Sequence, residues 1–266
     1  MLDRWLKCNE RNPSQYLKFS VIDATEVAIL SSEIREYLTQ MLRRSIFDSN
    51  FLEKLADYLN WSNVKKMIRE KVPIQETNKR GDFGEALIVE ILEQFHGYKV
   101  PVYKLRYKIT SDQRLPATDA IAVKVDKYGN VTEVCFIESK LRTRFINLDC
   151  DVATKGCNQL QNDYDSEIPA IIQFVATRLY ESSDSLLEPF LSYMRSRIDN
   201  TDKDTFRLGL CWERTEWDEL VLENLEENNN VNLPKLTVHV IRINNLKQIT
   251  DELFNTLGII ELSDDD

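Results

Sequence analysis

The sequence predicts an α/β protein in which helices flank a mixed β-sheet. Apolar runs of strand length, as in 134–137 and 206–212, alternate with segments whose apolar residues recur at helical spacing. The chain has 266 residues, of which 42% are hydrophobic and 29% charged, so it can bury a substantial core. The sequence contains no apolar run long enough to span a bilayer, and we therefore expect a soluble globular protein.

The first part of the chain predicts a mainly helical extension, 1–74, that precedes the main α/β domain, 75–266. Apolar residues recur at helical spacing after a short β-prone run, and a proline follows the last helical segment. The predicted elements of the extension are a strand over 15–23 and helices over 33–47, 51–59 and 64–72. Because the extension carries no motif, we expect it to contribute to the hydrophobic core or to form a docking surface for a partner.

A long helix is predicted near the start of the main domain. Residues 75–80 are polar and predict a loop, after which Asp82 is in place to cap the helix N-terminus. Apolar side chains form one stripe along this helix, and Gly97 is well placed to end it. Residues 98–107 predict an extended segment that leads into the next strands.

The stretch 115–144 predicts a β-hairpin. Residues 120–125 form a first strand, Gly129-Asn130 signals a tight turn, and 131–137 returns as a second strand. The second strand contains the unbroken apolar run 134–137, which is typical of a central strand covered on both faces.

The rest of the chain alternates between predicted helices and strands. The predicted order is a helix over 151–164, a β-rich run within 169–180, a helix over 185–198, a strand over 206–212, a helix over 216–227, a strand over 236–243 and a helix over 246–257. Gly156 weakens the first of these helices, because glycine is a poor helix former. The sequence shows no internal repeat and no long linker, so we expect 75–266 to fold as one domain.

The charge and the cysteine content argue against several classes of function. A formal net charge of -10 disfavours a protein that grips nucleic acid with its whole surface. The five cysteines lack CxxC spacing and the N-terminus lacks the apolar segment of a signal peptide, so we expect reduced thiols in a cytosolic protein. His96 and His239 are the only histidines, which disfavours His-based metal clusters and most Ser-His or Cys-His catalysis.

Charged residues appear abruptly where the second strand of the hairpin ends. Side chains alternate along a strand, so Glu138 and Lys140 point to the same side, and Asp119 begins the opposite strand nearby. Such carboxylates can hold Mg²⁺, or Mn²⁺ in its place, and the ion activates water and stabilises charge on a scissile phosphate. The main-chain carbonyl of Ser139 is a further candidate ligand, and a lysine beside the ion can orient the water.

This pattern resembles the PD-(D/E)xK nuclease superfamily, also called restriction-endonuclease-like. The motif reads Asp119 and then Glu138-Ser139-Lys140, and Pro116 lies three positions before the aspartate instead of beside it. Over roughly 80–180 the resemblance implies a core with a helix, a bent hairpin that carries the acidic motif, and a further helix and strand. Members often place a glutamate on the preceding helix near the metal, and Glu85 matches that position.

Each candidate also has a simpler interpretation. Glu85 stands at capping-box spacing from Asp82 and can close a helix N-terminus, alone or while it also binds a metal. Asp119, taken alone, can be a turn or strand-start residue. Glutamate and lysine at alternate strand positions often form an exposed pair, but the preceding apolar run favours the functional interpretation here.

Taken whole, the chain resembles the HamA family, the nuclease subunits of the Hachiman antiphage defence system. The resemblance rests on Gly81–Ala86 at the helix start, on Thr118–Ala122, on Glu138–Lys140 and on the α/β region that follows. It implies a DNA-cleaving effector held by a superfamily-two helicase, HamB, in the bacterial cytoplasm. Arg142 and Arg144 fall on the Lys140 side of the strand, which suits contacts with DNA phosphates.

Two other functions stay open at this point. One is a non-catalytic interaction subunit on a nuclease-like fold that regulates a helicase, as the acidic balance and the motif-free first segment suggest. The other is an RNase or a structure-specific nuclease, which differs only in substrate because the phosphate chemistry is shared.

Overall fold

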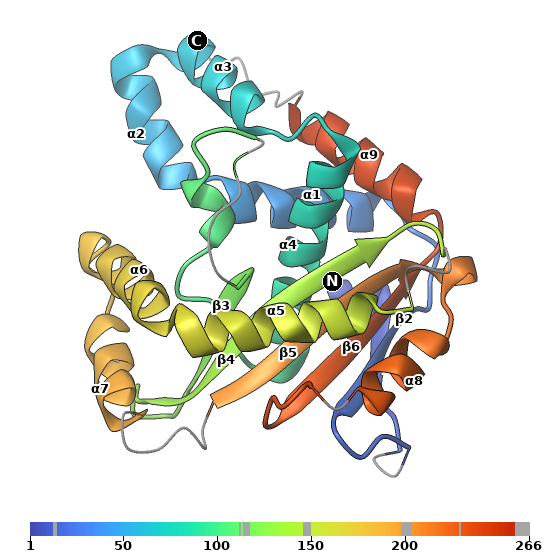
Figure 1. Ribbon diagram of the computed structural model, residues 1–266. Coiled ribbons are helices and arrows are strands. Elements are labelled where there is room, and N and C mark those ends of the chain that lie inside the picture. The colour runs from blue at the N-terminus through green and yellow to red at the C-terminus, as the bar shows by residue number, and fades with distance from the viewer. Residues whose placement is uncertain are drawn as a thin grey trace.

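A mixed β-sheet with helices on both faces forms the centre of the protein, as the sequence predicts (Figure 1). The computed structural model describes residues 1–12, 15–111, 113, 118–145, 150–197, 204–228 and 230–258. The expectation for Pro116 therefore lies outside the described residues. No helix in this described part of the chain is long and apolar enough to cross a membrane.

The sheet has the strand order β1-β2-β6-β5-β4-β3. In chain order the strands are β1 Leu6–Glu10, β2 Ser20–Glu26, β3 Ala120–Val125, β4 Val131–Arg142, β5 Asp204–Glu213 and β6 Leu236–Ile243. The four central strands run parallel, and each edge strand is antiparallel to its neighbour. Strands β4, β5 and β6 carry long apolar runs because helices cover both of their faces.

Helices and short 3₁₀ turns fill the segments between the strands. They are η1 Leu2–Arg4, α1 Ser32–Ile46, α2 Ser49–Leu59, α3 Trp61–Lys71, α4 Glu76–His96, η2 Lys104–Tyr107, α5 Val152–Ser166, α6 Ile168–Glu181, α7 Leu187–Arg197, η4 Arg214–Glu216, α8 Leu220–Glu227 and α9 Leu246–Gly258. The predicted helices in the first extension, after the hairpin and at the end of the chain are confirmed, with ends shifted by a few residues.

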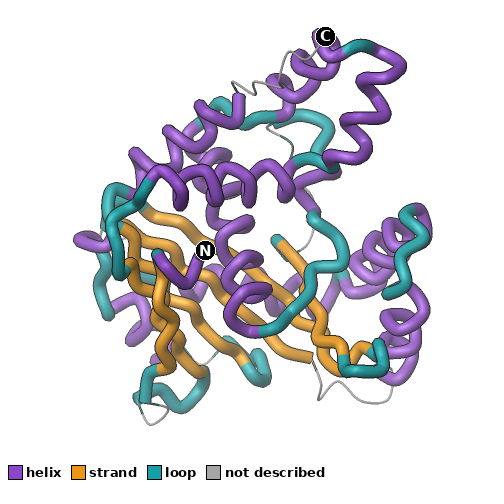
Figure 2. The backbone as a smooth tube through the Cα atoms, turned by 180° about the vertical axis from the view of Figure 1, so that it is seen from behind, coloured by secondary structure: helices purple, strands orange, loops and turns teal. Residues whose placement is uncertain are grey.

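Two layers of helices enclose two hydrophobic cores. Helices α1, α4 and α9 pack on one face of the sheet, while α5, α7 and α8 belong to the other layer. Figure 2 shows the same arrangement from behind, with the α2–α3 pair projecting away from the sheet. The site described below lies between the two layers, so both of them contribute residues to it.

The start of α4 differs from the prediction. The helix begins at Glu76, so the loop expected over 75–80 is wrong and Asp82 does not cap the helix. Two ion pairs with α9 hold the first turns of α4. Glu76 pairs with Lys247, and Lys79 pairs with Asp251. Gly97 ends the helix as predicted, in the left-handed conformation with φ 68°.

A helix, α6, replaces the β-rich run expected within 169–180. Its buried side chains are Ile171, Val175 and Leu179, which recur every four residues along one helical face. Pro169 stands in the first turn, where its missing N–H costs no hydrogen bond. The β-branched residues had suggested a strand, but packing against the core decides the conformation.

The first 74 residues contribute more than helices. Strand β1 was not predicted, and β2 begins later than the strand expected over 15–23. Strand β2 pairs in parallel with β6, and so the sheet runs across the division proposed at residue 74. The segment 98–107 was expected to be extended, yet it ends in the 3₁₀ turn η2. The division into 1–74 and 75–266 stays a prediction.

Close packing of α4 on β5 gives a test of the fold. A methyl group at Gly209 would lie 3.0 Å from Cβ and Cγ1 of Ile88 in α4, so we expect Gly209→Ala to lower the free energy of unfolding by about 1–2 kcal/mol. Gly81→Ala is the matched control, because nothing lies within 4 Å of its added methyl group and alanine favours a helix. Urea unfolding measures both variants, and equal stabilities would contradict the packing described.

Candidate functional site

Strand β4 is longer than its neighbour β3, so the last part of β4 is not paired on the β3 side. The ladder between them reaches its last pair at Ala120 and Ile137, while β4 continues to Arg142. Beyond that pair, the N–H of Ser139 donates to Oδ2 of Asp119 at 2.7 Å. The N–H and C=O of one residue point to the same side of a strand, so the Ser139 carbonyl faces the same opening.

Glu138 and Lys140 lie together on the α5 side of β4. The Lys140 ammonium forms an ion pair with Oε1 of Glu138 and also donates to Oε1 of Gln159 on α5 at 3.1 Å. Gly156 lets α5 approach the sheet beside Lys140, since a methyl group there would lie only 2.7 Å from Cδ1 of Leu208 on β5. The alternation predicted from the sequence, and the closeness of Asp119, are both confirmed.

Helix α4 brings two more carboxylates to the opening. Asp82 and Glu85 line the same cleft as Asp119, and Asp82 forms an ion pair with Lys108. The capping interpretation of Glu85 is wrong because the helix starts nine residues earlier, at Glu76. Gly84 packs against the Ser139 hydroxyl, which would lie 3.3 Å from an added methyl group, so α4 sits close to β4 at this point.

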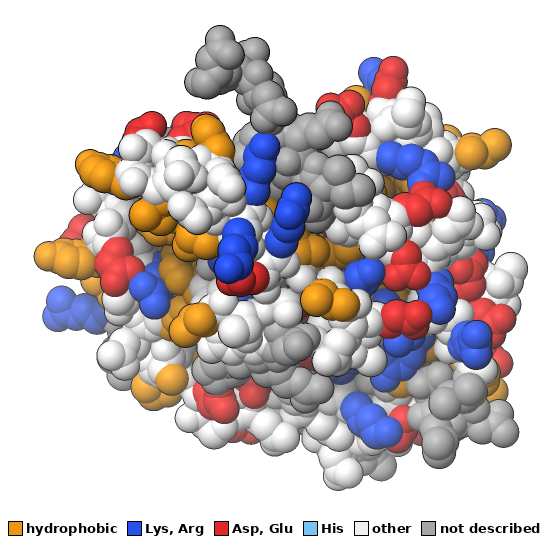
Figure 3. Space-filling view, turned by 90° about the horizontal axis from the view of Figure 1, so that it is seen from above, with side chains coloured by type: hydrophobic (Ala, Val, Ile, Leu, Met, Phe, Trp, Pro, Cys, Tyr) orange, Lys and Arg blue, Asp and Glu red, His pale blue; other side chains and the backbone are white. Residues whose placement is uncertain are grey.

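These groups line a cleft of about 720 Å³, called the site cleft below. Its acidic residues are Asp82, Glu85, Asp119 and Glu138, and its basic residues are Arg80, Lys104, Lys108, Lys140, Arg142 and Lys155. Arg142 is thus placed at the cleft, whereas Arg144 lies beyond the end of β4 and does not line it. On the face seen in Figure 3, basic and acidic side chains lie side by side, without one broad basic field.

The buried carboxylates are held in an unfavourable environment. Glu138 is 1% exposed, and burial together with Asp119 raises its pKa to about 8, although Lys140 opposes the shift. Burial and Asp119 also raise the pKa of Glu85 well above its ordinary value. Carboxyl groups that are buried and mutually repelling mark a functional site more often than a structural one.

The donor set fits a hard divalent cation. Oε2 of Glu138 is buried and has no hydrogen-bond partner within the described part of the chain, so a ligand can take it. Among the described residues no group of three acidic, histidine or cysteine side chains is already arranged as a metal cluster. Mg²⁺ needs no such cluster, because it usually takes one or two carboxylates directly and keeps several waters.

Two residues near the site were missed by the sequence analysis. Lys104 of η2 lies among Glu85, Asp119 and Glu138, and Asp163 of α5 carries a buried Oδ2 without a hydrogen-bond partner in the described chain. Asp163 stands four residues after Gln159 on α5, and this helical spacing was a usable signal. No local sequence pattern marked Lys104 as a candidate, because the loop before it carries no motif.

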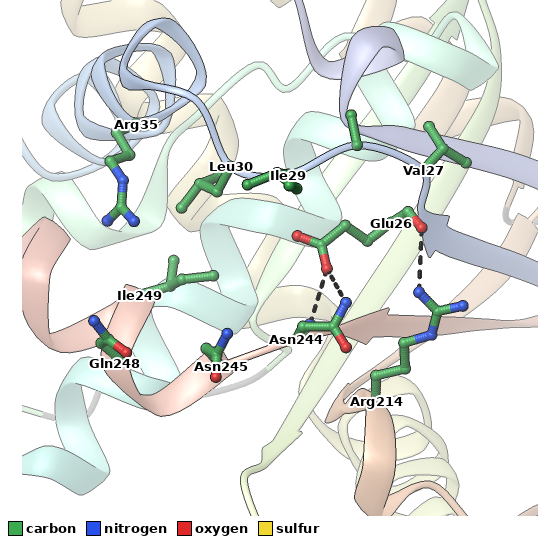
Figure 4. Close-up of a pocket in the computed structure, with 11 residues that line it drawn as sticks. Glu26, Val27, Ile29, Leu30, Arg35, Arg214, Asn244, Asn245, Gln248 and Ile249 are labelled. Atoms are coloured by element: carbon green, nitrogen blue, oxygen red, sulfur yellow. Dashed lines mark hydrogen bonds between the residues drawn. The ribbon is translucent and has the colours of Figure 1, made fainter.

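A second hollow, of about 510 Å³, lies beside α9 and the loop after β2 (Figure 4). The carboxylate of Glu26 there accepts hydrogen bonds from the main-chain and side-chain nitrogens of Asn244, and its carbonyl accepts one from Arg214. The polar groups bond to one another, so this hollow offers no unpaired carboxylate for a reaction. The site cleft is therefore the candidate functional site.

The pH dependence of stability tests the environment of Glu138. Its pKa is about 8 in the folded protein and near 4.5 when unperturbed, so the folded state holds an extra proton between those values. The free energy of unfolding should therefore fall as the pH rises from about 5 to about 8 in metal-free buffer. We expect Glu138→Gln to flatten this dependence by on the order of 2 kcal/mol in urea unfolding. Glu53→Gln, at an exposed carboxylate on α2, is the control, and an unchanged slope in Glu138→Gln would contradict the assignment.

Comparison with known proteins agrees with the resemblance seen in the sequence. A model of the HamA family matches residues 1–257. The Hachiman protein HamA of Bacillus cereus is 25% identical over 158 residues, which are 59% of this chain and 54% of that protein. The chain thus spans about half the length of this curated relative. Because the family model covers almost the whole chain, the protein belongs to the HamA family.

Proposed function

We propose that the protein is a metal-dependent deoxyribonuclease that hydrolyses phosphodiester bonds in the site cleft. The observation that carries the proposal is the buried Oε2 of Glu138, which has no hydrogen-bond partner among the described residues and lies beside Asp119 and Lys140 at the open side of β4. Basic residues line the same cleft and suit a phosphate backbone. We also propose that the core belongs to the PD-(D/E)xK superfamily, because the hairpin and its acidic motif follow one another in the order typical of that superfamily.

Each residue has a distinct role in this mechanism. Mg²⁺ or Mn²⁺ would be held by one or two carboxylates from the set Glu85, Asp119 and Glu138, together with the Ser139 carbonyl. When bound, the ion lowers the pKa of a coordinated water and offsets charge on the scissile phosphate. The Ser139 N–H fixes the carboxylate of Asp119, and Gln159 holds the Lys140 ammonium at the cleft, where it can orient the attacking water.

The biological setting is proposed from family membership. The Bacillus cereus relative is named as a Hachiman protein, and we propose that this chain also acts in antiphage defence. We further propose a superfamily-two helicase, HamB, as its partner in the bacterial cytoplasm. A helicase that carries most of the DNA-binding charge is consistent with the net charge of -10 on this chain.

One observation favours a second function. No three-ligand metal cluster is ready-made among the described residues, and Glu138 is already in an ion pair with Lys140. A nuclease-like fold that has become a non-catalytic regulator of a helicase would also show this arrangement. An RNase would use the same residues, so the assay below includes RNA.

Removal of the central acid or base tests the chemistry. We expect Glu138→Ala and Lys140→Ala each to lower cleavage of plasmid DNA in Mg²⁺ by about 10²-fold or more, since Glu138 would hold the ion and Lys140 would orient the attacking water. The assay uses the purified chain with and without its helicase and ATP, in Mg²⁺ or EDTA. Lys127→Ala is the charge-matched control, because Lys127 lies at the turn between β3 and β4, the opposite end of the hairpin.

Full cleavage by Glu138→Ala would overturn the proposed site. Absence of metal-dependent cleavage by the wild-type complex on both DNA and RNA would favour the non-catalytic subunit. Cleavage of RNA alone would keep the mechanism and change the substrate.

Arg142 gives a separate test of phosphate binding. Because Arg142 lines the site cleft, we expect Arg142→Ala to raise KM for DNA several-fold and to reduce the slope of log binding constant against log salt by about one. Arg144 was predicted to bind phosphate too, and its position past β4 implies a smaller effect for Arg144→Ala. Binding isotherms at several salt concentrations measure both, and equal slopes in Arg142→Ala and wild type would exclude a contact from Arg142.

A further inference from the structure

Lys104 occupies a place where three hollows meet. It lines the site cleft, a hollow of about 90 Å³ beside α6, and a hollow of about 10 Å³ under α4. It belongs to the 3₁₀ turn η2, and its ammonium donates to the main-chain carbonyl of Thr118 at 2.6 Å. A long cationic side chain therefore forms part of the wall between the acidic cleft and the apolar interior.

The hydrogen bond from Lys104 acts on the residue before Asp119. Thr118 is only 3% exposed, so its carbonyl has little access to water as an alternative donor. The Asp119 carboxylate is held on its other side by the N–H of Ser139. Lys104 and β4 thus fix the Thr118–Asp119 segment from two directions, although no strand ladder continues there.

Lys104 also places positive charge close to Glu85. Of the lysines near the four cleft carboxylates, Lys108 is engaged with Asp82 and Lys140 with Glu138 by direct ion pairs. Lys104 is the cation that most strongly opposes the raised pKa of Glu85, and it lines the same cleft as Asp119. Without Lys104, Glu85 would lose its strongest cationic neighbour while it still faces the repelling charge of Asp119.

We propose that Lys104 is a positioning residue of the metal site, which holds Asp119 in place and balances Glu85 and Asp119 until a divalent cation binds. This role rests on the proposed metal site. It implies that the charge of Lys104 matters most in the metal-free protein, because a bound divalent cation takes over the compensation of the carboxylates. A side chain that merely fills space would matter equally in both states.

The test compares thermal unfolding of the full chain in EDTA and in millimolar Mn²⁺. We expect Lys104→Met to lower Tm by about 5 °C in EDTA, and to recover most of that loss in Mn²⁺, so that its metal-induced gain exceeds that of wild type. Lys104→Gln keeps a donor for the Thr118 carbonyl but removes the charge, and it should also gain more from Mn²⁺ than wild type does. Lys104→Gln replaces Lys104→Met as the test variant if Lys104→Met does not fold in either condition.

Lys71→Met is the matched control. Lys71 is also a partly buried lysine that donates to a main-chain carbonyl, that of Arg106 in η2, but it packs over the Phe47 ring and does not line the site cleft. Its loss of Tm should be the same in EDTA and Mn²⁺.

The outcomes separate the two proposals. A larger Mn²⁺ gain in the Lys104 variants than in wild type and Lys71→Met supports the role of Lys104. A gain equal to that of wild type overturns it and leaves the metal site standing. If Mn²⁺ and Mg²⁺ raise the Tm of no variant and not of wild type, the metal site itself is overturned and the role of Lys104 with it.

Discussion

The hydrogen bond from the Ser139 N–H to Asp119 is the interaction on which the arrangement of the site depends. It exists because β3 stops pairing at Ala120 while β4 continues, so that a main-chain donor is left without a strand partner. A buried donor without a partner is costly, and the carboxylate satisfies it. The same gap in the ladder turns the Ser139 carbonyl toward the opening and lets groups from α4, η2 and α5 meet there.

The second constraint is electrostatic. Four carboxylates line the site cleft, and burial disfavours the charged forms of Asp82, Glu85 and Glu138. Lysines from two segments offset part of that charge, namely Lys104 and Lys108 in and directly after η2, and Lys140 on β4. Holding carboxyl groups that repel one another lowers the stability of the fold. Such a loss is expected at a site that binds a cation and a phosphate chain.

Packing at glycines sets the distances between the layers. Gly84 and Gly209 let α4 approach β4 and β5, and Gly156 lets α5 approach Leu208 of β5 from the other face. The close approach of both helices brings Glu85 and Gln159 to opposite sides of one strand end. The glycines in these helices lower intrinsic helix propensity, so tertiary packing must supply the difference.

Much of the outline could be read from local patterns. The apolar run of Leu236–Ile243 matches β6 residue for residue, and strand alternation placed Glu138 and Lys140 together, because both features depend only on neighbouring residues. Three features required tertiary contacts: the helical state of α6, the start of α4 at its ion pairs with α9, and the arrival of Lys104 beside Asp119. Local periodicity reports that a face is buried, but only the packed chain decides which distant segment covers it and which distant charge is brought beside it.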